Sequence, residues 1–519
     1  MKGRAPNPLP EGEGNRREAV VEGASPGGSR RGQPPLHQPA AGPPPRAGED
    51  RSALYLWLTL LAALVAFAIL RPVDHDESQY VAAAVLSAHG LMPYRDYAYL
   101  QTPLQPMLLA PLTALLGGWA WPGLRIVNAL LAALAVAGTY RATRAGGVAK
   151  RVALAAAGLF AACDILLFAA GTARNDALPA ACLAGALWLA MRPATRNRAL
   201  LTGLLLAGAT AAKLSYALPA LAYGLATLVD RQRRPALLLA GALPMAALVG
   251  WTAYGAPEAF RFDVLTFPTT APAEFYAGAS KLSIPGRLLD AAKFLALGPA
   301  LLALALVTKR RQVGWLDLLI VAGLVAGLLP SPTWRQYWLP MLPPLFVRLA
   351  VLWEEHAPPT TVRVAAGLFA AIGLAPSLIG AAHGPGLLAA LHQSRAIRAA
   401  LDRAHETGPV ATLAPEFLPA TYRLPDPRFA TGPFYFRSLA LLDAAAEARV
   451  HVVSRARLDT GLAVRPEAVL VGGEARWTSG DVALDAALEH WAVTHGYRAV
   501  PVAGARFRLY VDPRVSSSR

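Results

Sequence analysis

The chain has 519 residues, of which 55% are hydrophobic and only 16% are charged, and its mean hydropathy is +0.37. A soluble domain carries about 25% charged residues, so the composition excludes an ordinary soluble protein. The net charge is +16. Nucleic acid is excluded as a partner because the basic residues flank apolar runs rather than forming a patch with interleaved aromatics. They are typical of membrane topology signals and lipid headgroup contacts.

Residues 1–51 are rich in Pro, Gly, Arg and Glu. Such a segment cannot bury enough apolar surface to offset its ordering entropy, so we expect a disordered cytoplasmic tail. It is too long and too acidic for the start of a cleaved signal peptide. Residues 52–70 then form an apolar run of about 19 residues, enough for one membrane span. The following loop is net acidic and is expected outside.

Apolar runs alternate with basic connectors as far as residue 382. The run 104–116 contains two prolines and is interpreted as re-entrant or interfacial, with a true span as the alternative. Residues 199–229 have basic connectors at both ends, which favours a hairpin of two short helices that turns near Lys213. Further spans are expected in the run that follows 104–116 and ends at Tyr140 to Arg144, and at 151–170, 177–191, 235–254, 286–307, 313–330, 336–353 and 362–382. The pattern predicts a mainly α, polytopic bundle of about eleven spans.

The character of the chain changes at residue 383. Apolar runs shorten to strand length at 410–413, 451–453, 468–471 and 507–511, with helical patterns at 387–404 and 482–494. Short strands that alternate with helices indicate a small α/β domain over residues 383–519. Because every basic connector falls inside, this domain is expected on the extracytoplasmic side, with the bundle in the cell membrane.

The densest charge cluster is Asp74-His75-Asp76-Glu77, directly after the first span. Like charges repel, so a metal ion or a general-base role would explain why the carboxylates are together. A solvated acidic turn explains them as well. His75 is either a metal ligand or an ordinary polar loop residue.

Three charged residues stand out further along. Lys213 lies in an apolar run, where lysines are rare and usually functional, although pairing with a carboxylate is the alternative. Asp176 either caps a helix or faces a site. Arg174 either contacts a lipid phosphate or extends its side chain to the membrane surface.

The order of several motifs resembles the C-type (GT-C) superfamily of membrane glycosyltransferases. That superfamily includes protein O-mannosyltransferases, the lipid A aminoarabinose transferase and the rhizobial lipopolysaccharide core transferases. The resemblance covers residues 52–382 well and the C-terminal domain loosely. It rests on these stretches in order: Asp76-Glu77 with Tyr80, Gly90, Pro93-Tyr94-Arg95-Asp96, Pro103-Leu104, Arg174-Asn175-Asp176-Ala177-Leu178, Gly208 to Ser215, and Arg335-Gln336-Tyr337-Trp338-Leu339-Pro340.

The resemblance implies a role for each matched residue. Asp76 would be the general base or the carboxylate that positions the acceptor, with Glu77 beside it and Asp176 as a third catalytic carboxylate. The substrate-binding residues would be Tyr80, Tyr94, Arg95, Arg174, Lys213, Arg335 and Tyr337, with Lys213 and Arg335 near the donor phosphate. Members of the superfamily differ in metal dependence, so Asp76 and Asp176 are also candidate ligands of a divalent metal.

The predicted function is an inverting glycosyltransferase that moves a sugar from a polyprenyl-phosphate carrier to an extracytoplasmic glycan, lipid or protein. The alternative is a transporter or flippase. The sequence has no Walker-type phosphate-binding motif, which argues against an ATP-driven pump. Segments broken by Gly and Pro do not recur at matching places in two halves, which argues against a secondary transporter. A family member that has lost its activity is a third reading.

Overall fold

The computed structural model describes residues 47–309, 314–384, 386–438, 441–475, 480–504 and 506–516. The chain divides into two compact units, Met1–Ser52 and Ala53–Arg519. Most of the predicted disordered tail, residues 1–46, lies outside the described residues. The first helix, α1, begins at Ala47 rather than at residue 52.

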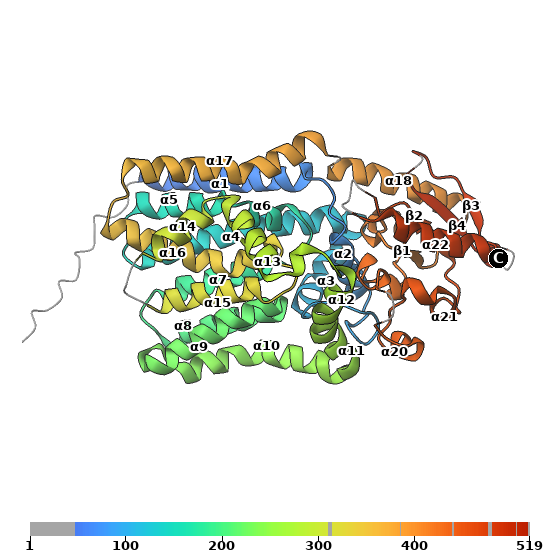
Figure 1. Ribbon diagram of the computed structural model, residues 1–519, viewed down its shortest axis with the longest axis horizontal. Helices are drawn as coiled ribbons and strands as arrows, with labels where there is room; N and C mark the ends of the chain where they lie inside the picture. Colours follow the sequence, from blue (N-terminus) through green and yellow to red (C-terminus); the bar gives the residue numbers. More distant parts are fainter. Residues whose placement is uncertain are drawn as a thin grey trace, which may run out of the picture. The chain divides into compact units, whose positions relative to one another are not determined.

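A bundle of helices makes up most of the second unit (Figure 1). Its helices approach closely where one of them carries glycine. A Cβ atom at Gly203 would lie 1.9 Å from the carbonyl oxygen of Leu238, and one at Gly241 would lie 2.0 Å from that of Leu200. Small residues allow such contacts between membrane helices. The helices are α1 (Ala47–Leu70), α2 (Glu77–Ala88), α3 (Leu104–Leu116), α4 (Ala120–Ala145), α5 (Lys150–Ala161), α6 (Asp164–Gly171), α7 (Ala177–Ala190), α8 (Arg196–Ala212), α9 (Ala217–Val229), α10 (Pro235–Gly255), α13 (Ile284–Ala296), α14 (Ala300–Val307), α15 (Trp315–Leu328), α16 (Leu342–Glu355) and α17 (Thr360–His383).

Within the described residues, three helical stretches are long and apolar enough to cross a membrane: Leu104–Ala145, Pro235–Gly255 and Thr360–His383. Two bent pairs, α5 with α6 (65°) and α13 with α14 (102°), raise the number to five. The predicted count of eleven spans is therefore not confirmed, since several apolar helices are only 10–17 residues long. The run that we interpreted as re-entrant is continuous with the next helix over 42 residues. The predicted break at Lys213 is present between α8 and α9.

The two bends contact each other. The backbone N–H of Asp164 donates to the carbonyl oxygen of Leu297 at 3.0 Å. Gly298 has a φ of +132°, and a Cβ atom there would lie 2.8 Å from Cα of Cys163. This close approach requires glycine. It places Asp164 at the start of α6, fully buried, in the middle of an apolar segment.

The C-terminal part contains a four-stranded sheet in the order β1-β2-β4-β3, shown in red beside α18 and α22 in Figure 1. β1 (Val410–Thr412) pairs parallel with β2 (Ala468–Val471); β4 (Arg508–Val511) pairs antiparallel with β2 and with β3 (Arg498–Val500). The helices α18 (Leu387–Arg403) and α22 (Val482–Thr494) match their predicted ranges. Three predicted strands are confirmed. The one at 451–453 is wrong, because His451 has a φ of +57° and the segment pairs with no strand.

An apolar cluster joins this C-terminal part to α4 of the bundle. The rings of Trp121 and Phe417 lie 5.1 Å apart, and Phe417 lies 4.8 Å from Phe507. Gly432 has a φ of +57°, and a Cβ atom there would lie 2.2 Å from Oγ of Ser78 in α2. The C-terminal chain therefore runs directly against α2, where it can add side chains to a site formed by the bundle.

Candidate active site

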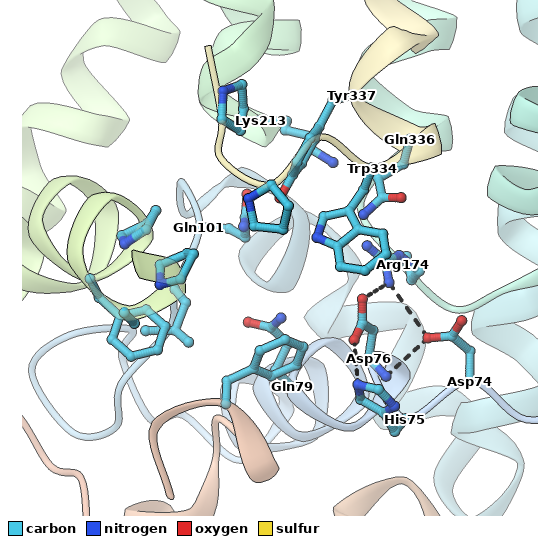
Figure 2. A pocket seen from close by; sticks show the side chains of 18 of the residues that line it. Asp74, His75, Asp76, Gln79, Gln101, Arg174, Lys213, Trp334, Gln336 and Tyr337 are labelled. Carbon is cyan, nitrogen blue, oxygen red and sulfur yellow. Dashed lines mark hydrogen bonds and ion pairs between the residues drawn. The ribbon is translucent and has the colours of Figure 1, made fainter. Parts of the chain in front are cut away.

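A cavity of about 380 Å³ lies between the first loop, the ends of several bundle helices and the C-terminal part (Figure 2). Segments far apart in sequence line it: residues 74–76, the start of α2, Arg174, Lys213, α12 (Phe267–Phe275), residues 330–337 and residues 434–437. Of the predicted site residues, Asp76, Tyr80, Arg174, Lys213, Arg335 and Tyr337 line this cavity.

The acidic loop residues form a compact ion-pair network (Figure 2). Asp76 accepts from Arg174 through one carboxylate oxygen, and its other oxygen lies 3.0 Å from Nε2 of His75. Asp74 lies 3.5 Å from the same guanidinium and accepts the backbone N–H of Asp76 at 3.0 Å. Both carboxylates remain about one-fifth exposed, at 21% each. They are therefore held in place and still accessible from the cavity.

The network shifts the pKa values of its members in different directions. Burial alone would raise the pKa of Asp76, but the charges of Arg174 and His75 hold it well below its usual range. Burial and the neighbouring Asp76 carboxylate instead raise the pKa of Asp74. For His75, burial acts in the lowering direction, but Asp76 and Asp74 raise the pKa to about 9. Asp76 is thus a fixed anion, and Asp74 is the stronger proton acceptor of the two.

Glu77 lies behind the wall of the cavity and does not line it. Its side chain is completely buried. It accepts two bonds from Arg125, at 2.5 and 2.8 Å, one from the indole of Trp121 at 2.7 Å and one from the backbone N–H of Ala173 at 3.1 Å. A carboxylate with its acceptor sites filled in this way braces α2 against α4 and the loop before α7.

Asp176 connects the acidic loop to the interior lysine. It precedes α7, but its carboxylate accepts no helix N–H, so the capping alternative is wrong. It accepts instead from Nε of Arg174 at 3.1 Å and from Nζ of Lys213. Lys213 lies in the extended break after α8 (φ −152°, ψ 121°), with its ammonium 5.5 Å from the ring centroid of Tyr337. Lys213 is both paired with a carboxylate and accessible to the cavity.

Arg335 is paired as well, with Nη1 3.1 Å from Oδ2 of the buried Asp164. Its side chain is 31% exposed, far more than the 4% of Arg174 and 6% of Lys213. Asp164 was not among the predicted site residues, although a carboxylate inside an apolar run is a signal that could have identified it.

Three arginines lie around the ring of Phe168 in α6. The guanidinium carbons of Arg335, Arg71 and Arg174 lie 4.0, 4.8 and 5.1 Å from its centroid. Cation–π contacts of this kind hold guanidinium groups in place without a counter-charge. Arg71, at the end of α1, was not among the predicted site residues, because its place beside the others depends on the folded bundle.

Two predicted substrate-binding residues do not line the cavity. Tyr94 is fully buried, donates to the carbonyl oxygen of Gln101 at 2.5 Å and lies 5.0 Å from the ring of Phe260. Arg95 is exposed and pairs with Asp96 at 2.8 Å. They shape the first loop, and neither reaches the space that a substrate would occupy.

The C-terminal part supplies a further cation, Arg437, which follows α19 (Pro433–Phe436). Its guanidinium carbon lies 4.3 Å from the ring centroid of Phe275 and 5.0 Å from that of Phe434. Unlike Arg174, Lys213 and Arg335, it forms no ion pair with any carboxylate in the described part of the chain. Nothing in the sequence pattern pointed to it.

The predicted metal ligands do not form a metal site. No group of three or more His, Cys, Asp or Glu residues suited to a metal ion occurs among the described residues. Asp76 and Asp176 both pair with Arg174, so a guanidinium occupies the space between the two carboxylates. This arrangement does not fit a divalent ion, and no step below depends on one.

No protein-family model and no curated protein sequence matches the chain. Solved structures do. ArnT from Cupriavidus metallidurans in the apo state aligns with a TM-score of 0.57 at 15% identity, over 89% of this chain and 98% of that one. The same protein bound to undecaprenyl phosphate aligns with a TM-score of 0.54 at 15% identity, over 88% and 98%. The chain therefore has the fold of ArnT, as the resemblance to the GT-C superfamily implied.

Proposed function

We propose that this membrane protein is an inverting glycosyltransferase that moves a sugar from a polyprenyl-phosphate carrier to an acceptor hydroxyl on the outer side of the membrane. The observation that carries the proposal is the ion-pair chain from Asp76 through Arg174 and Asp176 to Lys213, in which Asp76, Arg174 and Lys213 line the cavity and the buried Asp176 connects them. This ion-pair chain brings carboxylates that can bind an acceptor hydroxyl close to cations that can bind a phosphate. The fold shared with ArnT, one of whose structures holds undecaprenyl phosphate, supports a lipid-linked donor.

Lys213 and Arg335 are the donor-side cations in this proposal. When the bond between the anomeric carbon and the phosphate oxygen breaks, its electron pair stays on the polyprenyl phosphate, which gains negative charge. Positioned donors aimed at that charge lower the barrier. Arg335 is the more exposed of the two and keeps guanidinium N–H groups beyond its bond to Asp164. Lys213, at the helix break, adds a point charge.

The carboxylates of the acidic loop act on the acceptor. The acceptor oxygen forms a bond to the anomeric carbon from the side opposite the phosphate, which inverts the centre in one step. Asp76, kept ionised by Arg174 and His75, accepts a hydrogen bond from the hydroxyl and orients it. Asp74, whose pKa is raised, takes the proton as the bond forms. Of the two roles open to Asp76, its paired state favours positioning.

The proposal places the cavity, the C-terminal part and the acceptor outside and the N-terminus in the cytoplasm, since the connectors at the other ends of α7 and α8 are basic. The test compares cells that lack the protein with cells complemented by the wild type or by Asp76→Asn. We expect one envelope glycan or glycolipid to lose a sugar in the deletion and in the variant. In a transporter, the substrate would cross sealed vesicles without covalent change.

A further inference from the structure

A second cavity, of about 390 Å³, lies at the opposite ends of the two helices that lead to the candidate active site. α7 begins after Asp176 and ends before Met191; α8 begins at Arg196 and ends before Lys213. At 1.5 Å per residue these helices are roughly 21 to 26 Å long. The two helices therefore separate the two cavities by most of the hydrocarbon thickness of a bilayer, which is about 30 Å.

The second cavity is lined by three arginines, Arg192, Arg198 and Arg233, and by one carboxylate, Asp230. Asp230 pairs with Arg233 at 2.9 Å. Arg192 and Arg198 form no ion pair with any carboxylate within the described ranges. Two positive charges at the cavity are therefore left without a protein counter-charge, although both side chains are half-buried.

Tryptophans hold these arginines in position. The guanidinium carbon of Arg192 lies 4.7 Å from the ring centroid of Trp188, and that of Arg233 lies 5.0 Å from the ring of Trp315. Arg198 donates to the carbonyl oxygen of Pro193 at 3.0 Å. Arginines fixed in this way lose little entropy when they bind a phosphate through two parallel hydrogen bonds.

The surroundings of the cavity are apolar and exposed. Side chains next to its lining residues have exposed fractions of 47% (Leu201 in α8), 91% (Val229 in α9) and 66% (Leu239 in α10). In a membrane these faces meet acyl chains. A free phosphate would leave them without a ligand contact, whereas a phospholipid would place its headgroup in the cavity and its chains along the helices.

We propose that this cavity binds the phosphate headgroup of an anionic phospholipid from the leaflet opposite the candidate active site. Basic pockets between membrane helices recognise such headgroups. The proposal is independent of the transfer reaction, since none of its residues lines the first cavity. The arginines of the cavity also differ from arginines that only determine membrane topology. Other arginines of the same connectors are exposed and lie outside the cavity: Arg196, Arg231 and Arg234.

The test uses the full-length protein, delipidated in detergent and supplied with cardiolipin, phosphatidylglycerol or phosphatidylcholine. Bound lipid is counted by native mass spectrometry, and thermal stabilisation is measured in parallel. We expect the wild type to retain the two anionic lipids and not phosphatidylcholine. Arg192→Gln/Arg198→Gln should weaken that retention by about tenfold or more, because two phosphate-binding side chains are lost. Arg196→Gln/Arg231→Gln removes the same charge from the same connectors and should retain lipid as the wild type does.

Equal retention by the two double variants would overturn the proposal, as would equal binding of phosphatidylcholine by the wild type. Inorganic phosphate that competes with the lipid at equal concentration would show that a free anion is the ligand, and would also overturn it. If the double variant does not fold, Arg192→Gln alone serves. The Arg192 side chain forms no hydrogen bond with a backbone or side-chain atom of the described residues. The bundle should therefore tolerate the loss of this side chain.

Discussion

Nζ of Lys213 donates to the carboxylate of Asp176, and this bond ties the break between α8 and α9 to the loop before α7. Both side chains are almost fully buried, at 6% and 1% exposure. Because the same carboxylate accepts from Arg174, the charge of Lys213 is linked to Asp76 in the acidic loop. The proposed donor and acceptor sides are thus parts of one network.

Lys213→Ala should reduce transfer by about 10²-fold or more, because it removes a cation aimed at the leaving phosphate. It also leaves Asp176 with one partner fewer, so Lys213→Arg, which keeps the charge, is the matched control. Initial rates at varied donor concentration are the measurement. A variant with unchanged dependence on the donor would exclude a phosphate-binding role.

Asp74→Asn should remove the acidic limb of the pH–activity profile, which is the fall in transfer rate at low pH. Transfer requires Asp74 without its proton, and its pKa is raised, so wild-type activity should fall as the pH drops through a value above that of an ordinary aspartate. The asparagine variant should be slow at every pH and lack this limb. An unchanged limb in that variant would assign the proton transfer to another group.

His75→Gln should change how stability depends on pH. The neighbouring carboxylates raise the pKa of His75 from its usual 6.5 to about 9. A raised pKa contributes stability that is complete below 6.5 and is lost as the pH rises through about 9. Thermal unfolding of the wild type should therefore show a fall in Tm across this window, and the variant should show a smaller one. Equal slopes would mean that His75 is neutral in the folded protein.

Glu77→Gln should lower the free energy of unfolding rather than the rate of transfer by the folded protein. Removing one partner of the buried pair with Arg125 leaves an uncompensated charge, which costs about 3–5 kcal/mol. Glu77→Leu/Arg125→Leu removes both charges and should be less destabilised than the single variant. Thermal unfolding gives the comparison, and activity is normalised to the folded fraction. Loss of turnover in well-folded Glu77→Gln would restore Glu77 as a catalytic candidate.

Arg437→Ala tests whether Arg437 of the C-terminal part binds the acceptor. We expect KM for an anionic acceptor to rise by about tenfold, with KM for the donor unchanged, because Arg437 follows α19 in the C-terminal part whereas Lys213 follows α8 of the bundle. Arg437→Lys should recover part of the loss. An equal effect on both substrates would indicate that Arg437 only supports the shape of the cavity.

The sequence identified most of the charged network because charge in an apolar context is costly and so stands out, as at Lys213 and Asp176. It could not separate Asp76 from Glu77, which are adjacent. The structure does, because Asp76 is the last loop residue and faces the cavity, whereas Glu77 begins α2 and faces Arg125. Arg437 and Arg71 were missed because long-range packing against Phe275 and Phe168 determines their positions.

The count of eleven spans is not confirmed, because several of the apolar helices are only 10–17 residues long. Hydropathy finds apolar runs, but it does not register the bends before Asp164 and at Gly298, where two runs each break into two helices. The break at Lys213 was predictable because basic connectors at both ends of the run required a turn.

The central claim is that Asp76 and Lys213 act on one lipid-linked sugar donor and one acceptor. It is tested most directly by purified protein in liposomes, given a polyprenyl-phosphate sugar and the acceptor lost from deletion cells. Release of polyprenyl phosphate is measured together with the glycosylated acceptor. The account predicts equal amounts of both products with the wild type, neither product with Asp76→Asn, and a loss of both products by about 10²-fold or more with Lys213→Ala. Full product formation by both folded variants would contradict it.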